Sequence, residues 1–161
     1  MKLIPLTQGK FAQVDDEDYD FLMQWKWQAV CVRGGWYVTR GFQKTTLRMH
    51  RVVLNVIDSR ISVDHIDHNG LNNQKSNIRK CSQAQNCMNR SRGKNTTSKY
   101  MGVSFKKSHK KYVAYIHLPI PNSHKGRQVY LGIFESEVEA AKARDVASKK
   151  HHGEFANLNF K

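Results

Sequence analysis

A short segment beyond the middle of the chain does most to constrain how the sequence can fold. Residues 91–98, Ser-Arg-Gly-Lys-Asn-Thr-Thr-Ser, contain no large apolar side chain and several residues that favour turns. This composition is typical of a flexible basic linker and marks the best domain boundary in the 161 residues. Because domains can be as small as about 50 residues, the chain can hold more than one. We expect a small β-rich N-terminal region at 1–45, a compact core at 46–92, a basic linker at 93–99 and a further domain at 100–161.

The chain is strongly basic, with a formal net charge of +14. The excess is +1 over residues 1–45, +6 over residues 46–98 and +7 over residues 99–161. A positive charge of this size favours a polyanionic partner, most simply nucleic acid, because phosphate contacts release bound counterions. We therefore expect the partner to be held mainly by the middle and the C-terminal part. An anionic membrane surface is the alternative, but no long basic amphipathic helix supports it.

Three cysteines, Cys31, Cys81 and Cys87, are spread along the chain without a C-x-x-C pair. This sparse, odd count argues against a disulfide framework and against a four-ligand zinc site. We therefore expect no structural zinc and a reducing, cytoplasmic location. Residues 1–6 are too soon followed by polar residues to form a signal peptide, and no apolar run approaches the roughly 18 residues that span a membrane. A soluble protein with no membrane partner is expected.

The first 56 residues predict short strands and two short helices. Residues 10–14 alternate between apolar and polar side chains, and residues 36–40 follow the turn pair Gly34-Gly35. The acidic run at 15–18 suits the positive end of a helix that continues to residue 25 with one apolar face. We interpret these carboxylates as the solvated start of a helix, in preference to a metal site. Residues 47–56 predict a strand that runs into a short helix.

The densest group of chemically active residues begins at residue 63. Residues 63–70 are Val-Asp-His-Ile-Asp-His-Asn-Gly, and carboxamides follow at Asn73, Asn77 and Asn86. Oxygen and imidazole groups at this density suit a hard divalent cation and a general base better than a structural purpose. An imidazole with its ordinary pKa of about 6.5 can take a proton from water at neutral pH. A carboxylate with a neutral amide oxygen can hold one Mg²⁺ or Mn²⁺.

The Asp64-His65 pair, followed by Asn77 and Asn86, resembles the HNH nuclease motif. In that motif Asp-His ends one strand of a hairpin, and a distal Asn or His returns from a short helix. The resemblance implies a ββα-metal (His-Me finger) core that hydrolyses a phosphodiester, with His65 as the general base. It also implies that Asp64 and Asn86 are the metal ligands, and that Asn77 fixes the loop and supports the histidine. A strand would send adjacent side chains to opposite faces, so the strand end must relax that alternation.

The details of the motif place it in a subgroup. An Asn as the final ligand matches the HNH nucleases of phages and intron-associated homing elements, and the missing zinc cysteines match minimal HNH cores. Asn69 and Gly70 are predicted to form a tight turn between the two strands, because both tolerate positive φ. Asp67, His68, Asn72 and Asn73 are assigned to the turn and its loop. The short helix is expected at residues 82–89.

Three basic residues around the motif are candidates for phosphate contact. His50 could contact phosphate or the edge of the site, with a structural or surface role as the alternative. Arg79 and Arg90 could clamp phosphate, with a solvated basic face as the alternative.

Beyond the linker, the sequence predicts three strands at 100–105, 112–118 and 128–134, and then a helix at 135–150. Ser136 with Glu139 forms a capping box, and small alanines give the helix a face that can lie close on a sheet. The motifs Tyr-Met-Gly-Val at 100–103, Leu-Gly-Ile-Phe at 131–134 and Glu-Ala-Ala-Lys-Ala-Arg-Asp at 139–145 resemble the AP2/ERF DNA-binding domain. The resemblance implies a three-stranded antiparallel sheet backed by one helix.

The face of that sheet away from the helix is expected to bind DNA, because the major groove admits a β-ribbon. Several arginines and a tryptophan that the plant proteins of this family use are replaced here, so lysines that favour phosphate prevail and sequence specificity is expected to be lower or different. The candidate DNA-binding residues of this domain are Lys106, Lys107, Lys111, Tyr112, His117, Arg127 and Tyr130.

The sequence thus predicts an α+β protein that combines an HNH-type endonuclease core with an AP2-like module. We expect it to act as a monomer on double-stranded DNA, with one divalent cation and no small-molecule cofactor, and to nick one strand per active site. One alternative is a catalytically inactive, HNH-derived DNA-binding regulator. A second alternative, from the charge alone, is an RNA-binding protein.

Overall fold

The computed structural model describes residues 1–32, 34–91, 97–120 and 126–160. They form a mixed α+β protein with several small antiparallel sheets and few helices, as the sequence predicts. Contacts divide the chain into two compact units, Met1–Ser82 and Gln83–Lys161. Each unit is considered by itself. Residues 93–96 of the predicted linker lie outside the described residues, and no described helix is long and apolar enough to cross a membrane.

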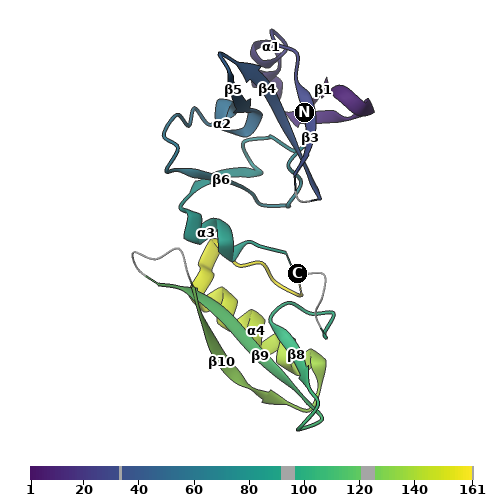
Figure 1. Ribbon diagram of the computed structural model, residues 1–161, viewed down its shortest axis with the longest axis vertical. Helices are drawn as coiled ribbons and strands as arrows, with labels where there is room; N and C mark the ends of the chain where they lie inside the picture. Colours follow the sequence, from purple (N-terminus) through teal and green to yellow (C-terminus); the bar gives the residue numbers. More distant parts are fainter. Residues whose placement is uncertain (33, 92–96, 121–125, 161) are drawn as a thin grey trace. The chain divides into compact units, whose positions relative to one another are not determined.

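The first unit contains three small antiparallel sheets (Figure 1). Its helices are the 3₁₀ turn η1 (Thr7–Gly9), α1 (Asp16–Leu22) and α2 (Met49–Val53). Its strands are β1 (Lys2–Pro5), β2 (Phe11–Val14), β3 (Gln28–Val32), β4 (Gly35–Phe42), β5 (Thr45–Arg48), β6 (Ser62–His65) and β7 (Ile78–Cys81). Strand β1 pairs with β2, β4 lies between β3 and β5, and β6 pairs with β7. The predicted strand and short helix over 47–56 are confirmed as β5 and α2.

One hydrophobic core holds this unit together across the predicted boundary at residue 45. Side chains from β1, β2, α1, β4 and α2 meet in it, including Ile4, Leu22, Val38 and Met49, each at most 1% exposed. The sheet β3–β4–β5 also crosses that boundary, because Leu47 and Arg48 of β5 pair with Arg40 and Thr39 of β4. The N-terminal strands and the segment after residue 45 therefore fold as parts of one structure.

The loop between β6 and β7 is longer than the predicted tight turn. It spans residues 66–77, and its positive φ falls on His68 at 63°, not on Asn69 or Gly70. Gly70 is required for a different reason. A Cβ at this position would lie 2.3 Å from the backbone oxygen of Trp36 and 2.6 Å from the ring of Tyr37. The loop thus packs directly on β4, and close approach replaces turn geometry as the constraint on this glycine.

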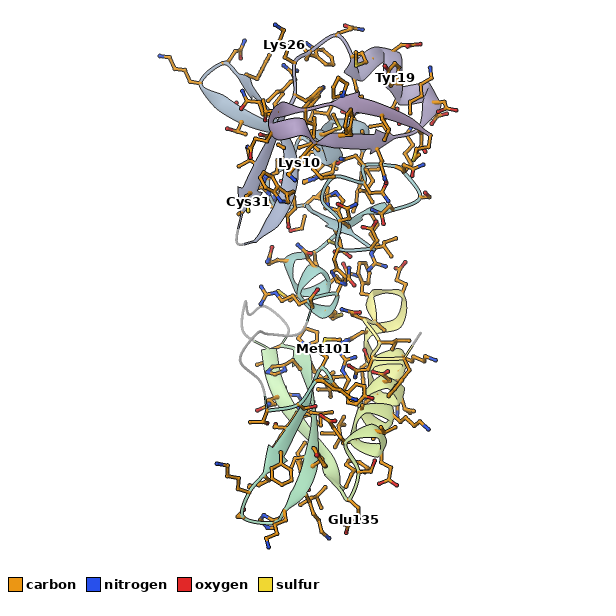
Figure 2. The ribbon with its side chains drawn as sticks, turned by 90° about the vertical axis from the view of Figure 1, so that its right-hand side faces the viewer. Lys10, Tyr19, Lys26, Cys31, Met101 and Glu135 are labelled. Atoms are coloured by element: carbon orange, nitrogen blue, oxygen red, sulfur yellow. The ribbon has the colours of Figure 1, made fainter. Side chains whose placement is uncertain are left out.

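The second unit consists of a short helix and a sheet covered by a long helix (Figures 1 and 2). Strands β8 (Val103–Lys106), β9 (Lys111–Pro119) and β10 (Gly126–Phe134) form an antiparallel sheet with β9 in the centre. The helices are α3 (Gln83–Met88), α4 (Glu137–His152) and the 3₁₀ turn η2 (Gly153–Phe155). The strands and helices predicted for this part are confirmed to within three residues at every end.

Helix α4 begins and packs as its sequence predicts. The hydroxyl of Ser136 accepts hydrogen bonds from the backbone N–H groups of Val138 and Glu139, which caps the helix. Ala140 and Ala141 are completely buried against Val103 and Ala114 of the sheet. The small side chains let the helix axis approach the strands closely.

The end of the predicted linker belongs to this second unit. Ser98 is buried, and its hydroxyl donates a hydrogen bond to the carboxylate of Glu137 at 2.7 Å. Thr97 accepts one from the backbone N–H of Phe105. After α4, the Asp145 carboxylate accepts bonds from the backbone N–H groups of Asn159 and Phe160. Polar side chains therefore fasten both the segment before β8 and the residues that follow α4.

Candidate functional site

Strand β6 of the first unit carries the Asp-His pair. Asp64 lies opposite Arg79 of β7, and His65 lies opposite Ile78. Adjacent residues of a strand normally face opposite sides, yet Asp64 and His65 are only 5% and 6% exposed. Both can be buried because β6 ends at His65, where the packed loop 66–77 begins.

Asn77 closes this loop with its side chain. Its carboxamide nitrogen donates to the carboxylate of Asp67 and to the carbonyl of Asn72, both at 2.9 Å. Its carboxamide oxygen accepts from the backbone N–H of Asp67 at 3.1 Å, and its carbonyl accepts from Ile66 at 2.9 Å. Burial raises the pKa of Asp67, but hydrogen bonds from Asn69, Asn72 and Asn77 outweigh it and leave that pKa below its ordinary value. The loop directly after His65 is therefore pinned.

The N-terminal strands hold the other side of the same loop. Gln13 of β2 accepts a hydrogen bond from the backbone N–H of Asn73 at 2.8 Å, and its own N–H donates to Leu71 at 2.9 Å. Asp15 precedes α1 but makes no capping bond with its side chain. Its carboxylate instead accepts from the side chain of Gln74 and the backbone N–H of Lys75. The acidic run thus serves the loop as well as the start of the helix.

His65 lies in surroundings that favour the neutral imidazole. Burial lowers its pKa below the ordinary 6.5, and hydrogen bonding to Asn73 and the charges of Asp67 and Asp64 act in the opposite direction with smaller weight. At neutral pH the ring is therefore uncharged, which is the form that can accept a proton.

Two aromatic rings pack against His65. The ring of His50, on α2, meets it edge-on with centroids 4.9 Å apart, and the ring of Tyr37, on β4, lies 6.1 Å away. His50 is only 4% exposed, and burial followed by the nearby His65 lowers its pKa to about 3. For His50 the sequence left open a contact with phosphate or the edge of the site and a structural or surface role; the structure places its ring inside the protein beside His65.

Arg51, the neighbour of His50 on α2, fixes the segment that leads into β6. Its guanidinium donates to the carbonyl of Ile61 and to that of Asp58, each at 2.8 Å. One short helix therefore holds both the ring of His65 and the start of the strand that carries it.

Asp64 is engaged by a cation of the protein itself. The Nε and Nη2 atoms of Arg79 lie 3.0 and 2.8 Å from one carboxylate oxygen of Asp64, and the two side chains are 15% and 6% exposed. Arg79 was a candidate to clamp phosphate, with a solvated basic face as the alternative; the structure directs its guanidinium at Asp64. By donor chemistry Asp64 fits a hard divalent cation. Such an ion must share this carboxylate with Arg79 or displace it.

Asn86 and Arg90 belong to the second unit. Asn86 lies half-buried on α3, and Arg90 is exposed just beyond that helix. The ligand role of Asn86 and the phosphate role of Arg90 stay predictions. Among the described residues no three His, Cys, Asp or Glu side chains form a metal-binding cluster, and one carboxylate with one carboxamide would not count as such a cluster.

The sheet of the second unit presents part of the predicted DNA-binding set. Opposed residues in an antiparallel pair share a face, and Lys106 pairs with Lys111, and Tyr130 with Tyr115. Alternation puts Lys106, Lys111, His117 and Tyr130 on the face away from α4, and Lys107 lies just past the end of β8.

Two members of the set are placed differently. Tyr112 packs toward the core that α4 covers, because alternation along β9 puts it on the same side as the buried Ala114. Arg127, exposed near the start of β10, pairs with Leu118 and so falls on the side of Tyr112. The expectation that both residues lie on the free face was wrong.

Sequence reasoning missed several residues around His65. Tyr37, Gln13 and Asp15 lie far from the motif in sequence, and nothing local marks them as its neighbours. Asn73 was assigned to the loop, yet its side chain is completely buried beside His65. The position of Asn73 inside the motif was only a weak signal that its side chain would be buried beside the histidine.

Comparison with known proteins agrees with this geometry. No protein-family model matches the chain. A protein of Acanthamoeba polyphaga mimivirus, described as an uncharacterized HNH endonuclease, is 31% identical to it over 164 residues. The similarity covers 98% of this chain and 79% of the relative. The matched length includes both units and the Asp-His-Asn motif. This chain belongs to the HNH endonuclease family.

Proposed function

We propose that the protein is a metal-dependent DNA endonuclease that hydrolyses a phosphodiester and nicks one strand per active site. The observation that carries the proposal is the buried, neutral His65 beside Asp64 at the end of β6, with the following loop pinned by Asn77. In a chain of the HNH family this arrangement supplies a base held in a fixed position. The relative's name supports nuclease activity.

In this proposal each residue of the chain has a stated task. The imidazole of His65 takes a proton from the attacking water. Its lowered pKa keeps the ring neutral at neutral pH, so it can accept that proton. Asp64 offers a carboxylate, and Asn86 is retained as the second ligand from its place in the motif. A bound Mg²⁺ or Mn²⁺ would supply positive charge to the phosphate and the leaving oxygen. Asn77 keeps the loop after His65 in place.

We propose further that the second unit is an AP2-like module that holds double-stranded DNA. Support comes from its three-stranded antiparallel sheet, the capped helix behind it and the basic side chains on the outer face. Lys106, Lys111 and Tyr130 are the residues on that face that we expect to meet the duplex. Lysines act mainly as point charges, so contacts with phosphate should dominate over base recognition.

A plasmid-nicking assay tests the catalytic proposal. Wild-type protein with Mg²⁺ should convert supercoiled DNA to the nicked form, and EDTA should stop the reaction. His65→Ala should lower the rate by roughly 10²–10⁴-fold, the usual contribution of a general base. His151→Ala, an exposed histidine on α4, is the matched control. Equal, metal-independent rates for wild type and His65→Ala would contradict the proposal.

The pairing of Asp64 with Arg79 favours one competing function, a DNA-binding regulator that has lost activity. The guanidinium of Arg79 lowers the affinity of the Asp64 carboxylate for a metal ion, because both cations compete for the same oxygens. Mn²⁺ titration followed by electron paramagnetic resonance separates the two functions. An active enzyme should bind Mn²⁺, and Arg79→Gln should bind it more tightly because the carboxylate loses its competitor. Absence of Mn²⁺ binding in both proteins would favour the regulator.

A further inference from the structure

The loop that joins α2 to β6, residues 54–61, carries an apolar side chain that is almost fully exposed to solvent (Figure 1). Ile57 is 91% exposed, the highest value for any large apolar side chain among the described residues. Contact with water is unfavourable for a branched aliphatic group, yet single exposed apolar residues are common in proteins. Exposure alone therefore assigns no function to Ile57, and a function follows only if the loop holds this side chain in place.

The backbone on both sides of Ile57 is fixed. The preceding residue, Val56, is buried, and its N–H donates to the carbonyl of Arg51 at 2.8 Å. The carbonyl of the following residue, Asp58, accepts a hydrogen bond from the Arg51 guanidinium, also at 2.8 Å. Branching at Cβ restricts the χ1 angle of an isoleucine further. Ile57 is thus a stiff apolar knob on a fastened loop.

The surroundings of Ile57 are positively charged. Residues 46–63 contain three arginines and one aspartate. The side chain of Arg60, in the same loop, is 88% exposed, and the Asp58 carboxylate holds its Nε and Nη2 atoms. The guanidinium has further N–H groups that can meet a phosphate. An apolar tip beside a basic group fits DNA, in which phosphates flank the apolar faces of stacked bases.

Helix α2 connects this loop to the strand that carries the proposed catalytic residues. The ring of His50, on α2, lies 4.9 Å from the ring of His65, and Arg51 donates to the carbonyl of Ile61, the residue before β6. The loop leads directly into β6, which carries Asp64 and His65. DNA that binds at this strand can therefore meet the loop as well.

We propose that Ile57 is a DNA wedge: its side chain enters between two neighbouring base pairs, partly unstacks them and bends the duplex. Proteins that insert apolar side chains in this way commonly do so from the minor groove. Unstacking costs least at pyrimidine–purine steps, so the wedge favours cleavage near such steps. Arg60 binds a phosphate beside the step. The inference rests on the proposed nuclease function, because it requires a duplex at β6.

Fluorescence of 2-aminopurine tests the wedge without cleavage, because this base is quenched while it is stacked. A series of short duplexes places it at each TpA step in turn, and EDTA prevents cutting. At saturating protein, followed by anisotropy, wild type should raise the emission at one step by at least about twofold. Ile57→Ser should bind the duplexes and leave the emission of free DNA. Ile57→Leu, which stays apolar, should retain most of the rise.

Two further variants separate the wedge from charge and from a general surface effect. Arg60→Gln should weaken binding by about threefold and keep the rise at saturation, because it removes a phosphate contact only. Val146→Ser changes an exposed β-branched residue on α4 of the second unit, and it should behave as wild type. Because Ile57 is exposed, Ile57→Ser should fold, and an unchanged midpoint of urea unfolding checks this.

Nicking assays give a second readout. Ile57→Ser should nick intact duplex about tenfold more slowly than wild type, because the duplex must then bend without help. A mismatched base pair at the mapped nick site should restore most of this rate, since such a pair is already partly unstacked. His65→Ala should gain nothing from the mismatch, because it lacks the proposed base.

The outcomes separate this inference from the proposed function. A wild type that raises the emission at no TpA step, or an Ile57→Ser protein that raises it as much as wild type, overturns the wedge. A mismatch that leaves the slow nicking by Ile57→Ser unchanged also overturns it. A wild type that cuts no DNA but unstacks a step through Ile57 contradicts the proposed function and supports the inference.

Discussion

The β6–β7 and β9–β10 hairpins of this protein use antiparallel strands for opposite purposes. β6 and β7 have four residues each and carry buried polar groups, with Asp64 and His65 at most 6% exposed. β9 and β10 have nine residues each, and their free face carries half-buried Lys111 with exposed His117 and Tyr130. The short hairpin depends on its surroundings for stability, and the long one has a sheet and a helix of its own.

The contrast fits the different demands of the two tasks proposed for this protein. A base must be held in one orientation, so the side chains around it are buried and tightly packed. Attraction of a polyanion works over several ångströms through water and needs only charge. Residues 83–161 accordingly carry 15 Lys and Arg against 5 Asp and Glu, whereas residues 1–82 carry 12 against 8.

The largest expected effect comes from Gly70, which tests how closely the short hairpin is packed. Gly70→Ala should destabilise the first unit by about 2–3 kcal/mol, because the new methyl would meet the backbone of Trp36 at 2.3 Å and this backbone cannot move aside. Gly41→Ala is the matched control, since nothing lies within 4 Å of its Cβ position. Urea unfolding gives both values. Equal stability of the two variants would show that the loop has room.

The next effect is a pH dependence of the stability of the first unit, which comes from the buried His50 and His65. His50 has a pKa of about 3 when folded and about 6.5 when unfolded, so its contribution to stability is complete above pH 6.5 and is lost as the pH falls toward 3. The loss should reach about 2 kcal/mol at pH 5, at 1.36 kcal/mol per pKa unit. His65, whose pKa is also lowered, acts in the same direction.

A variant isolates the part due to His50. His50→Phe keeps a flat ring but binds no proton, so its unfolding free energy should fall less between pH 7.5 and pH 5 than that of wild type. Urea unfolding at the two pH values measures the difference. If the free energy of unfolding falls by the same amount in both proteins, the pH dependence comes from groups other than His50. The buried histidine would then not distinguish the short hairpin from the long one.

The smallest effect concerns the exposed sheet face. Replacing Lys106 and Lys111 with glutamine should weaken DNA binding about tenfold at moderate salt. The stability of the second unit should change only by the small contribution of the surface ion pair between Lys111 and Glu135. If each lysine neutralises one phosphate, the slope of log K against log salt should become shallower by roughly 1.8. Fluorescence anisotropy at several salt concentrations measures it. An unchanged slope would mean that DNA does not lie on this face.

The sequence predicts more of the long hairpin than of the short one, because the long hairpin depends more on local patterns. The strands of the second unit and the cap at Ser136 follow from local patterns of alternation and capping, and the structure confirms them. To assign a side chain to one face of the sheet, the register of the strand pairs must be known. The sequence does not give that register, so Tyr112 and Arg127 were assigned to the wrong face. Alternation alone does not say which side of a sheet a helix will cover.

The surroundings of His65 were less predictable because they come from distant parts of the chain. The motif itself identified Asp64, His65 and Asn77 as one group, and the structure places them on one hairpin and its loop. Tyr37 and Gln13 join them only through tertiary packing, for which a single sequence carries no local signal. The prediction of positive φ at Gly70 was wrong, because what requires this glycine is space against β4 and not backbone conformation.

The pairing of Gln13 with the loop beyond β6 has a consequence for how such a nuclease could be transplanted. An engineer who excised residues 46–92 as a portable cutting cassette would sever the backbone bonds that Gln13 makes to Leu71 and Asn73, and the support of Asp15 with them. The excised piece would keep every residue of the motif, but the loop after His65 would no longer be held in place. A piece that begins at Met1 retains β2 and these bonds, so the N-terminal joint of a graft should not lie directly before Thr46. Its C-terminal joint should lie beyond Asn86, so that the proposed second metal ligand is kept.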